Sequence, residues 1–299
     1  MPERTRTIVM TGATSGIGAH ALQHLTARPG TRVIVGARQP SAPLADPGVE
    51  VLPLDLSSLA QVRAFAAAVI DRLGGAPIDA LVLNAGTQFM STKASSADGY
   101  ELTFAVNHLA HYLLARLLLP AVADGGRVIL TTSDTHDPRV IRSGPKSLDI
   151  DVWARPGGSP MTAYSASKLG NLLTSEKIAV LPETTERRIA SIAFNPGLTG
   201  GTGLSRSAPA AARALMQGLR PVFMLLSRFR PALYMNTPEH AGQTLAQLAD
   251  GTSTPPAGRV YASLVRGKLQ YPNPSDLARN PDARDEIWRR SAELTGLTG

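Results

Sequence analysis

The sequence predicts an α/β protein in which a doubly wound parallel sheet is covered by helices on both faces. Short apolar runs rich in β-branched residues recur along the chain, and such runs are typical of strands buried on both faces. Longer stretches of helical character separate these runs, and a glycine-rich turn joins the first run to the first helical stretch. The repeated order of strand, helix and strand is the doubly wound pattern.

The alternation continues through most of the chain. Strands are predicted at residues 7–11, 32–36, 49–54, 80–84, 127–132 and 189–195, and helices at residues 16–27, 58–73, 98–120 and 162–180. A later helix, 238–249, precedes a last strand, 259–264, which we expect at the edge of the sheet. Since no repeat or low-complexity linker divides the chain, residues 1–299 are predicted to form a single domain.

Residues 205–235 interrupt this alternation. The segment mixes apolar side chains with arginines, and Pro221 and Pro231 would break a helix within it. We therefore predict an inserted helical cap here.

The composition limits the classes of function. The chain has 299 residues, of which 43% are hydrophobic and 18% charged, as in a folded globular protein. It contains no cysteine, which excludes disulfides, thiolate nucleophiles and cysteine-ligated metals. The formal net charge is +7, but the arginines are scattered and aromatic residues make up only 5%, so we expect no nucleic-acid binding. The excess charge suits a solvated surface or attraction for a phosphorylated cofactor or anionic substrate.

The first residues of the sequence bear on the cellular location of the protein. Charges at Glu3, Arg4 and Arg6 run directly into the first strand, so we expect no signal peptide. The chain also lacks a run of eighteen uncharged apolar residues, so we expect no membrane span. These features favour a cytoplasmic protein.

The glycine-rich turn predicts a phosphate-binding loop. Residues 11–18 read TGATSGIG between the first strand and the first helix. Small residues let the backbone approach a pyrophosphate, which free N–H groups and the positive helix end would bind. A turn of this kind is also a common structural device, but its position favours the cofactor interpretation. The predicted contacts are Gly12, Thr14, Ser15, Gly16, Ile17 and Gly18.

The ends of the second and third strands suggest which dinucleotide binds. Arg38 stands where an acidic residue would hold a ribose 2′-hydroxyl, and its guanidinium can fork onto a 2′-phosphate. This favours NADP(H) over NAD, although Arg38 could also be an ordinary surface residue. Asp55 could accept a hydrogen bond from the adenine amino group, with Leu56 beside it in the cofactor site. Alternatively, Asp55 caps the helix that begins near Ser57 or Ser58.

Tyr164 and Lys168 form a candidate acid/base pair. They are four residues apart on a predicted helix and therefore share one face. A phenol with a pKa near ~10 exchanges protons poorly at neutral pH, but a close positive charge favours its ionised form. Tyr164 could then exchange a proton with a substrate oxygen as hydride is transferred.

Several motifs together resemble the short-chain dehydrogenase/reductase family over residues 7–203. They are TGxxxGxG, Asn84-Ala85-Gly86, Asn107, Ser133, YxxxK and Asn195-Pro196-Gly197, in that order. The resemblance implies a Rossmann-type sheet and a catalytic tetrad that transfers hydride without a metal. In this tetrad Asn107 would anchor a water of the proton relay and Ser133 would polarise the substrate oxygen. Tyr164 would be the acid/base, and Lys168 would bind the nicotinamide ribose and lower the tyrosine pKa.

The same resemblance adds cofactor contacts. It implies Asn84, Ala85, Gly86, Pro196, Gly197, Thr199 and Thr202, together with Tyr164 and Lys168. Many relatives carry a threonine at the position of Gly201. The sequence of this chain therefore does not decide whether the hydroxyl of Thr199 or that of Thr202 contacts the cofactor.

Residues 107–114 are similar to the corresponding segment of retinol dehydrogenases and light-dependent protochlorophyllide reductases, and the C-terminal helix resembles that of the reductases. Those photoenzymes carry a cysteine two residues after the lysine, where this chain has Gly170, so photoreduction is disfavoured. We interpret His108 and His111 as packing or hydrogen-bonding residues rather than metal ligands.

We therefore expect an NADP(H)-dependent oxidoreductase acting on a lipophilic ketone, aldehyde or alcohol. The long insert between Ser133 and Tyr164, with the cap at 205–235, would form an apolar roof over the nicotinamide. The basic cap could instead touch a membrane surface. Reduction of a carbon–carbon double bond and a non-catalytic, cofactor-binding regulatory role are the alternatives. Relatives often pair through the helices that bear Asn107 and Tyr164, so a homodimer or homotetramer is expected, although an extra apolar cap can also accompany a monomer.

Overall fold

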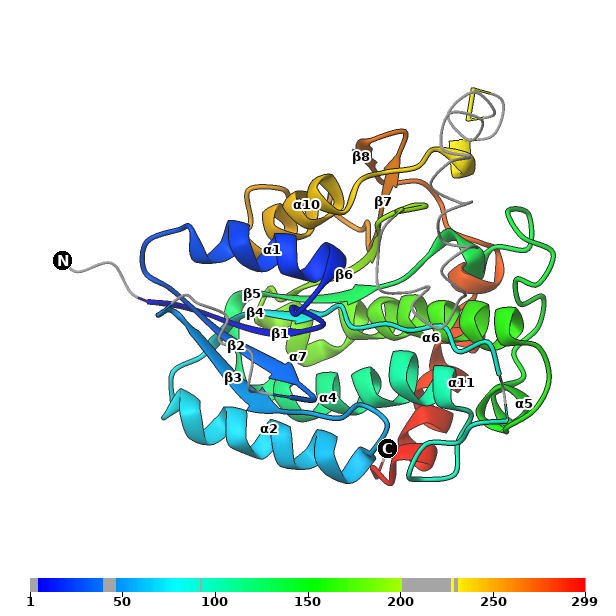
Figure 1. The fold of residues 1–299 in the computed structure, drawn as a ribbon, viewed down its shortest axis with the longest axis horizontal. Coiled ribbons are helices and arrows are strands. Elements are labelled where there is room, and N and C mark those ends of the chain that lie inside the picture. Colours follow the sequence, from blue (N-terminus) through cyan, green and yellow to red (C-terminus); the bar gives the residue numbers. More distant parts are fainter. Residues whose placement is uncertain (1–4, 40–46, 92, 201–226, 229–230, 299) are drawn as a thin grey trace.

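The fold is built on one sheet, which confirms the doubly wound α/β prediction (Figure 1). The structure, a computed structural model, describes residues 5–39, 47–91, 93–200, 227–228 and 231–298. Within them the eight-stranded sheet has the order β3-β2-β1-β4-β5-β6-β7-β8. The strands are β1 Arg6–Thr11, β2 Thr31–Ala37, β3 Val49–Pro53, β4 Ile78–Leu83, β5 Val122–Thr131, β6 Ala190–Asn195, β7 Tyr261–Val265 and β8 Lys268–Gln270. Strands β1 to β7 pair in parallel, and β8 pairs antiparallel with β7.

Helices cover both faces of the sheet. One face carries α1 (Gly16–Thr26) and α10 (Pro238–Asp250), which pack on each other. The other carries α2 (Leu59–Leu73), α4 (Ala110–Leu118) and α6 (Pro160–Val180), with α11 (Pro281–Thr295) packed outside α4 and α6. The shorter helices are α3 (Leu102–Phe104), α5 (Ile150–Ala154) and α7 (Pro182–Glu186). A π turn, Ala105–Leu109, joins α3 to α4, and 3-10 turns lie at Leu119–Ala121, Asp134–His136, Pro231–Leu233 and Leu277–Arg279.

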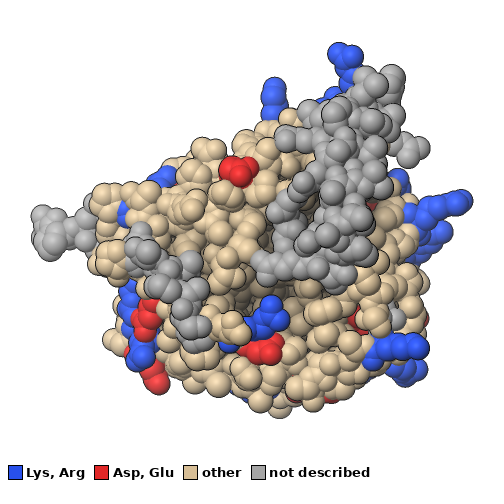
Figure 2. Space-filling view, in the orientation of Figure 1, with Lys and Arg blue, Asp and Glu red and all other residues tan. Residues whose placement is uncertain are grey.

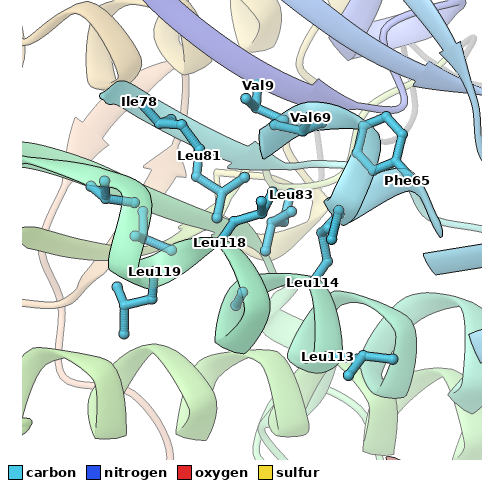
Figure 3. Packing of buried hydrophobic residues seen from close by; sticks show 14 of the residues in the cluster. Val9, Phe65, Val69, Ile78, Leu81, Leu83, Leu113, Leu114, Leu118 and Leu119 are labelled. Atoms are coloured by element: carbon cyan, nitrogen blue, oxygen red, sulfur yellow. The ribbon is translucent and has the colours of Figure 1, made fainter. Parts of the chain in front are cut away.

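The central strands are apolar on both sides because they separate two buried layers. Successive residues of β1 alternate between them: Val9 joins the core under α2 and α4, whereas Ile8 and Met10 join the core under α1 and α10. In the first of these cores, leucines of α4 pack against β4 and α2 (Figure 3). This double-sided packing explains why the strands read as continuous apolar runs.

The predicted elements are present with shifted ends, but the edge prediction is wrong. Strand β7 is not at the edge, because β8 continues the sheet as a hairpin partner. The turn between them contains Arg266 and Gly267, both with positive φ, of 50° and 72°. Two such residues form the tight turn whose twist suits a hairpin, and glycine there is the signal that could have revealed it.

The predicted helix at 98–120 is divided. It begins as α3, passes through the π turn, continues as α4 and ends in a 3-10 turn. Within the described residues, Leu102–Ala121 is long and apolar enough to cross a membrane, but 78% of its most apolar window is buried inside the protein. Its apolar character therefore fits a core helix. The cap predicted at 205–235 lies mostly outside the described residues.

Charged side chains are dispersed over the visible surface. On the face in Figure 2 most of the described Lys and Arg side chains lie around the periphery, some lie in the lower central part, and acidic side chains lie among them. This distribution is what the scattered arginines of the sequence predict.

Candidate active site

A cavity of about 630 Å³ opens at the carboxyl ends of the central strands. In a doubly wound sheet this edge is where ligands bind. The predicted site residues that line it are Gly12, Thr14, Ser15, Gly16, Ile17, Gly18, Arg38, Asp55, Leu56, Asn84, Ala85, Gly86, Ser133, Tyr164, Lys168, Pro196, Gly197 and Thr199. Thr202 lies outside the described residues. Asn107 lies behind the wall, where it contacts lining residues.

Glycines in the loop before α1 and in the first turn of α1 are required by the backbone. Gly12 has a φ of +69°, and a Cβ there would lie 2.6 Å from the Cα of Ala85. A Cβ at Gly18 would lie 1.9 Å from the Gly12 carbonyl oxygen. Ser15 precedes the helix, and its side chain makes no cap hydrogen bond within the described part of the chain. The positive end of α1 therefore faces a narrow, backbone-lined part of the cavity.

Thr11 connects this loop to the loop that follows β4. Its hydroxyl accepts hydrogen bonds from the backbone N–H groups of Asn84 and Ala85, both at 3.1 Å. The side chain of Asn84 donates to the Gly12 carbonyl at 3.2 Å and accepts from Thr131 at the end of β5 at 3.1 Å. Three strand ends are thus fixed by side chains. The sequence analysis identified Asn84 and included Thr11 in the glycine-rich motif without giving it a role, and it missed Thr131.

Arg38 and Asp55 lie at the part of the cavity formed by the ends of β2 and β3. Arg38 directly follows β2 and is exposed. Asp55 also lines the cavity, but its Oδ1 accepts from the N–H and the hydroxyl of Ser57, at 2.9 and 2.8 Å. The N-cap of α2 is Ser58, whose hydroxyl accepts from Gln61 N. Asp55 therefore shapes the turn before α2 while it faces the cavity.

Tyr164 and Lys168 lie side by side on α6, as their spacing predicts. Both are buried, and the Lys168 ammonium lies 5.5 Å from the centroid of the Tyr164 ring. The ammonium donates to the Thr131 carbonyl at 3.2 Å. Ser133 follows β5 on the same wall of the cavity. The structure therefore brings Ser133, Tyr164 and Lys168 together around one cavity.

Burial shifts the pKa values of this pair in opposite directions. It raises the pKa of the Tyr164 phenol, an effect that hydrogen bonding with Ser133 opposes and the nearby Asp134 carboxylate reinforces. It lowers the pKa of Lys168 from 10.5 to about 8. In both cases burial disfavours the charged form. The groups of the protein therefore hold Tyr164 protonated near neutral pH.

Asn107 lies in the π turn and is completely buried. Its side-chain oxygen accepts from Thr87 N and its amide donates to Thr87 O, both at 2.8 Å. The amide also donates to Ser167 on α6 at 3.1 Å. A π turn within an α-helix frequently marks a functional site. Here it places one amide between α6 and the loop after β4.

His108 and His111 are hydrogen-bonded to protein groups, in agreement with the sequence interpretation. His108 contacts Asn171 and Ser291, at 3.3 and 2.8 Å. His111 contacts the Thr11 hydroxyl and the Asn107 carbonyl, at 3.0 and 2.9 Å. Burial lowers the pKa of both rings to about 4, so both are neutral at pH 7. The described residues contain no group of three His, Cys, Asp or Glu residues placed to hold a metal.

Gly170 lies against His108. A Cβ at this position would come within 2.6 Å of the His108 ring. The position two residues after Lys168 therefore has no room for a side chain while that histidine stays in place.

A second cavity, of about 180 Å³, lies beside Ser133 and shares Gly197 with the first. Polar groups on its wall include Asp134, His136 and Tyr261. His136 is buried; its Nδ1 contacts the Ser133 carbonyl at 2.6 Å, and its Nε2 accepts from Ser275 N at 3.3 Å. The ring thus anchors the backbone of Ser133, a role that sequence reasoning did not assign.

Comparison with known proteins identifies the family. The model for "short chain dehydrogenase" matches residues 6–143. Polyprenol dehydrogenase of Mus musculus is 31% identical across all of this chain and 86% of its own length. The chain belongs to the short-chain dehydrogenase/reductase family. It is accordingly an oxidoreductase, as the order of its motifs predicts.

Other relatives of this oxidoreductase differ in what their names say they act on. Protochlorophyllide reductase A of Oryza sativa subsp. japonica is 31% identical over 98% of this chain and 81% of its own length. A proposed daunorubicin C-13 ketoreductase of Streptomyces sp. (strain C5) is 37% identical over 64% of this chain. That match spans 65% of the length of the Streptomyces protein.

Solved structures share the fold. An uncharacterised protein of Mycobacterium paratuberculosis superposes with a TM-score of 0.70 at 27% identity, covering 98% of this chain and 94% of that one. The NADPH-bound carbonyl reductase from chicken fatty liver gives a TM-score of 0.59 at 20% identity, covering 90% and 94% of the two chains. The oxidoreductase thus has NADP-bound structural neighbours.

Proposed function

We propose that this protein is an NADP(H)-dependent oxidoreductase that transfers hydride between the nicotinamide and a lipophilic ketone, aldehyde or alcohol. The observation that carries the proposal is that Ser133, Tyr164 and Lys168 line the same cavity as the glycine loop of α1. The bound cofactor would supply or accept the hydride.

The residues of the cavity fit a dinucleotide. Its volume of about 630 Å³ is ample for an extended ligand. A Cβ at Gly12 or Gly18 would collide with the backbone of Ala85 or of Gly12, so these glycines let the loop fold tightly at the N-terminus of α1, where a pyrophosphate would bind. Arg38 lines the cavity where the adenosine ribose of such a ligand would lie, which supports NADP(H) over NAD. Asp55 and Leu56 would contact the adenine.

The proton transfer is assigned to Tyr164. As burial keeps its phenol protonated, it is ready to donate to a carbonyl oxygen in the reductive direction. Ser133, on the same wall, would donate a hydrogen bond to that oxygen. Lys168 would hold the nicotinamide ribose, and its positive charge would assist loss of the phenolic proton in the oxidative direction. Asn107 would anchor a relay water, with its own position fixed by Thr87 and Ser167.

The substrate class rests on the relatives and on the second cavity. Two relatives are named for an alcohol and a ketone, polyprenol and the C-13 ketone of daunorubicin. The cavity beside Ser133 combines polar groups with apolar Val140, Leu198 and Leu264. We therefore propose a lipophilic substrate that also carries hydrogen-bonding groups.

The test is to incubate the pure protein with NADPH and a panel of hydrophobic carbonyl compounds and to follow nicotinamide absorbance. We expect at least one carbonyl to be reduced, with kcat lowered by roughly 10³-fold in Tyr164→Phe. NADPH should still bind the variant, because the phosphate loop and Arg38 are unchanged. Activity that is absent, or that is equal in the variant and the wild type, would refute the proposal.

Reduction of a carbon–carbon double bond is the second candidate, supported by the identity with protochlorophyllide reductase A. An enone substrate separates the two, because product analysis shows whether its carbonyl or its double bond has disappeared. A photochemical reduction is disfavoured, because the photoenzymes carry a cysteine where this chain has Gly170 and no cysteine occurs elsewhere in the chain. A purely regulatory cofactor-binding protein would bind NADPH without turnover of either bond.

Location and assembly remain predictions, namely a cytoplasmic protein that forms a homodimer or homotetramer. Pairing through the helices that bear Asn107 and Tyr164 would have to include α11, because α11 packs against α4 and α6. Light scattering on the purified chain would measure the assembly directly.

A further inference from the structure

His111 is a buried polar residue that the proposed mechanism does not use. It is fully buried on α4, and its two ring nitrogens contact groups that are far apart in the sequence. Nε2 lies 3.0 Å from the Thr11 hydroxyl, and Nδ1 lies 2.9 Å from the Asn107 carbonyl oxygen. The ring therefore bridges the strand end beside the phosphate loop and the π turn.

Counting donors and acceptors fixes the protonation of this ring. The Thr11 hydroxyl already accepts from the N–H groups of Asn84 and Ala85, which occupies both of its lone pairs. Its single proton must then be donated to Nε2 of His111. Nδ1 consequently carries the ring proton and donates it to the Asn107 carbonyl. The neutral ring that this requires agrees with a pKa lowered to about 4, chiefly by burial.

Both ends of this bridge reach the site. Through Thr11 the ring holds Asn84 and Ala85, which line the cavity opposite Gly12. Through the Asn107 carbonyl it holds the residue whose side chain is bonded to Thr87 and Ser167. A shift of the ring would therefore move the cofactor-binding loop and the proposed relay residue together.

We propose that His111 is a positioning residue that couples the cofactor-binding loop after β4 to the π turn that carries Asn107. The coupling itself is a property of the polypeptide, whereas its effect on turnover rests on the function proposed above.

Two substitutions separate the two hydrogen bonds. Asparagine places an amide at the position of Nδ1, so His111→Asn keeps a donor for the Asn107 carbonyl but loses the Thr11 contact. Glutamine places its amide oxygen near the position of Nε2, so His111→Gln keeps the Thr11 contact but loses the Asn107 contact. Tyr112→Phe is the control, because it removes a buried hydroxyl bonded to the Trp288 carbonyl from the same helix, on the side of α11.

Hydrogen exchange of the full chain without cofactor tests the coupling directly. In His111→Asn we expect exchange of the Asn84 and Ala85 amides to rise roughly tenfold, the size expected for one buried hydrogen bond, with little change at residues 105–109. His111→Gln should show the reverse pattern. Tyr112→Phe should leave both segments as in the wild type. Equal changes in all three variants, or protection unchanged in both His111 variants, would overturn the proposal.

Cofactor binding and turnover then show the functional consequence. We expect the NADPH dissociation constant, measured by calorimetry, to rise roughly fivefold in His111→Asn and to stay near the wild-type value in His111→Gln. With a carbonyl that the wild type reduces, kcat should fall mainly in His111→Gln. A general loss of stability would instead lower the melting temperature of all three variants without this separation between binding and kcat.

Discussion

The helical segment formed by the π turn and α4 has two buried sides. Each side carries a buried histidine, but the two histidines have different hydrogen-bond partners. Toward the strand ends, His111 and Asn107 contact Thr11 and Thr87, beside the cavity. Toward α11, His108 contacts Ser291, at 2.8 Å. Both histidines are fully buried, and burial lowers both pKa values to about 4. Burial and a shifted pKa therefore do not distinguish an active-site residue from a packing residue here, whereas the hydrogen-bond partners do.

The side toward α11 is an anchoring surface. The Tyr112 hydroxyl donates to the Trp288 carbonyl at 2.9 Å, and the Arg116 guanidinium lies 4.6 Å from the centroid of a Trp288 ring. Tyr100 also donates to the Leu294 carbonyl, at 2.8 Å. These contacts attach the C-terminal helix to α4 and its surroundings. Substitutions on this side should change stability, whereas those on the other side should change binding and turnover.

The largest effect that we expect from this comparison follows a change in the loop that Thr11 supports. Gly12→Ala places a Cβ 2.6 Å from the Ala85 Cα, which the backbone cannot relieve without opening the cavity wall. We expect NADPH affinity, measured by calorimetry, to fall by roughly 100-fold, since a shift of this wall disrupts several backbone contacts to the phosphates.

Gly30→Ala is the matched control for Gly12→Ala. Gly30 has nearly the same φ, +71°, but no atom lies within 4 Å of its added Cβ. The Gly30→Ala variant should lose about 1 kcal/mol of its free energy of unfolding through backbone strain, and it should bind NADPH normally. Equal losses of affinity in the two variants would show that strain, rather than contact with Ala85, is responsible.

A smaller effect is expected at the far end of the cavity. Arg38→Gln removes the guanidinium that would bind a 2′-phosphate, so the KM for NADPH should rise roughly tenfold. The KM for NADH, which lacks this phosphate, should hardly change, and the ratio of the two constants is the measurement. A parallel rise in both constants would contradict the assignment of Arg38 to the 2′-phosphate.

On the side toward α11, Ser291→Ala should affect stability alone. The substitution leaves Nε2 of the buried His108 without its hydroxyl partner, at a cost of about 1–3 kcal/mol in the free energy of unfolding. Denaturant titration measures this loss, and the kinetic constants should equal those of the wild type. If kcat/KM fell under conditions in which all of the variant is folded, the two sides of α4 would be coupled.

A further prediction concerns acid stability. The pKa of His108 is lowered in the fold from 6.5 to about 4, so between these values the unfolded chain binds a proton that the folded chain does not. Stability therefore rises with pH across this window and decreases as the pH falls from about 6.5 to about 4. His108→Asn should flatten this dependence in denaturant titrations at a series of pH values. An unchanged slope would show that other groups account for it.

The sequence predicts the parts of this molecule that depend on local pattern. The apolar runs indicate the buried strands, and the glycines of residues 11–18 indicate the phosphate loop because their spacing reflects a backbone requirement. Strand β8 is missed because three residues are too few to show the alternation of a strand, although Arg266-Gly267 marks the hairpin turn before it. The π turn is missed because five residues within a continuous helical pattern give no periodic signal.

The hydrogen-bond network behind the cavity could not be predicted from spacing. Thr11 and His111 are 100 residues apart, and only the parallel pairing of β1 with β4, followed by α4, brings them together. Each reads by itself as an ordinary strand threonine or a helical histidine. Motif order finds residues that a family shares at fixed positions, whereas the partners of those residues depend on how distant elements pack.

The contact between Gly170 and His108 has a consequence for engineering. A thiol introduced at residue 170 would point at the imidazole of the neighbouring helix, whose nearest atom lies 2.6 Å from the new Cβ. Room for it would require a smaller residue at 108 as a companion change, and that change would also remove a connection to the C-terminal helix. A cysteine-based proton donor therefore cannot be grafted onto this scaffold by one replacement, because two helices would have to be redesigned together.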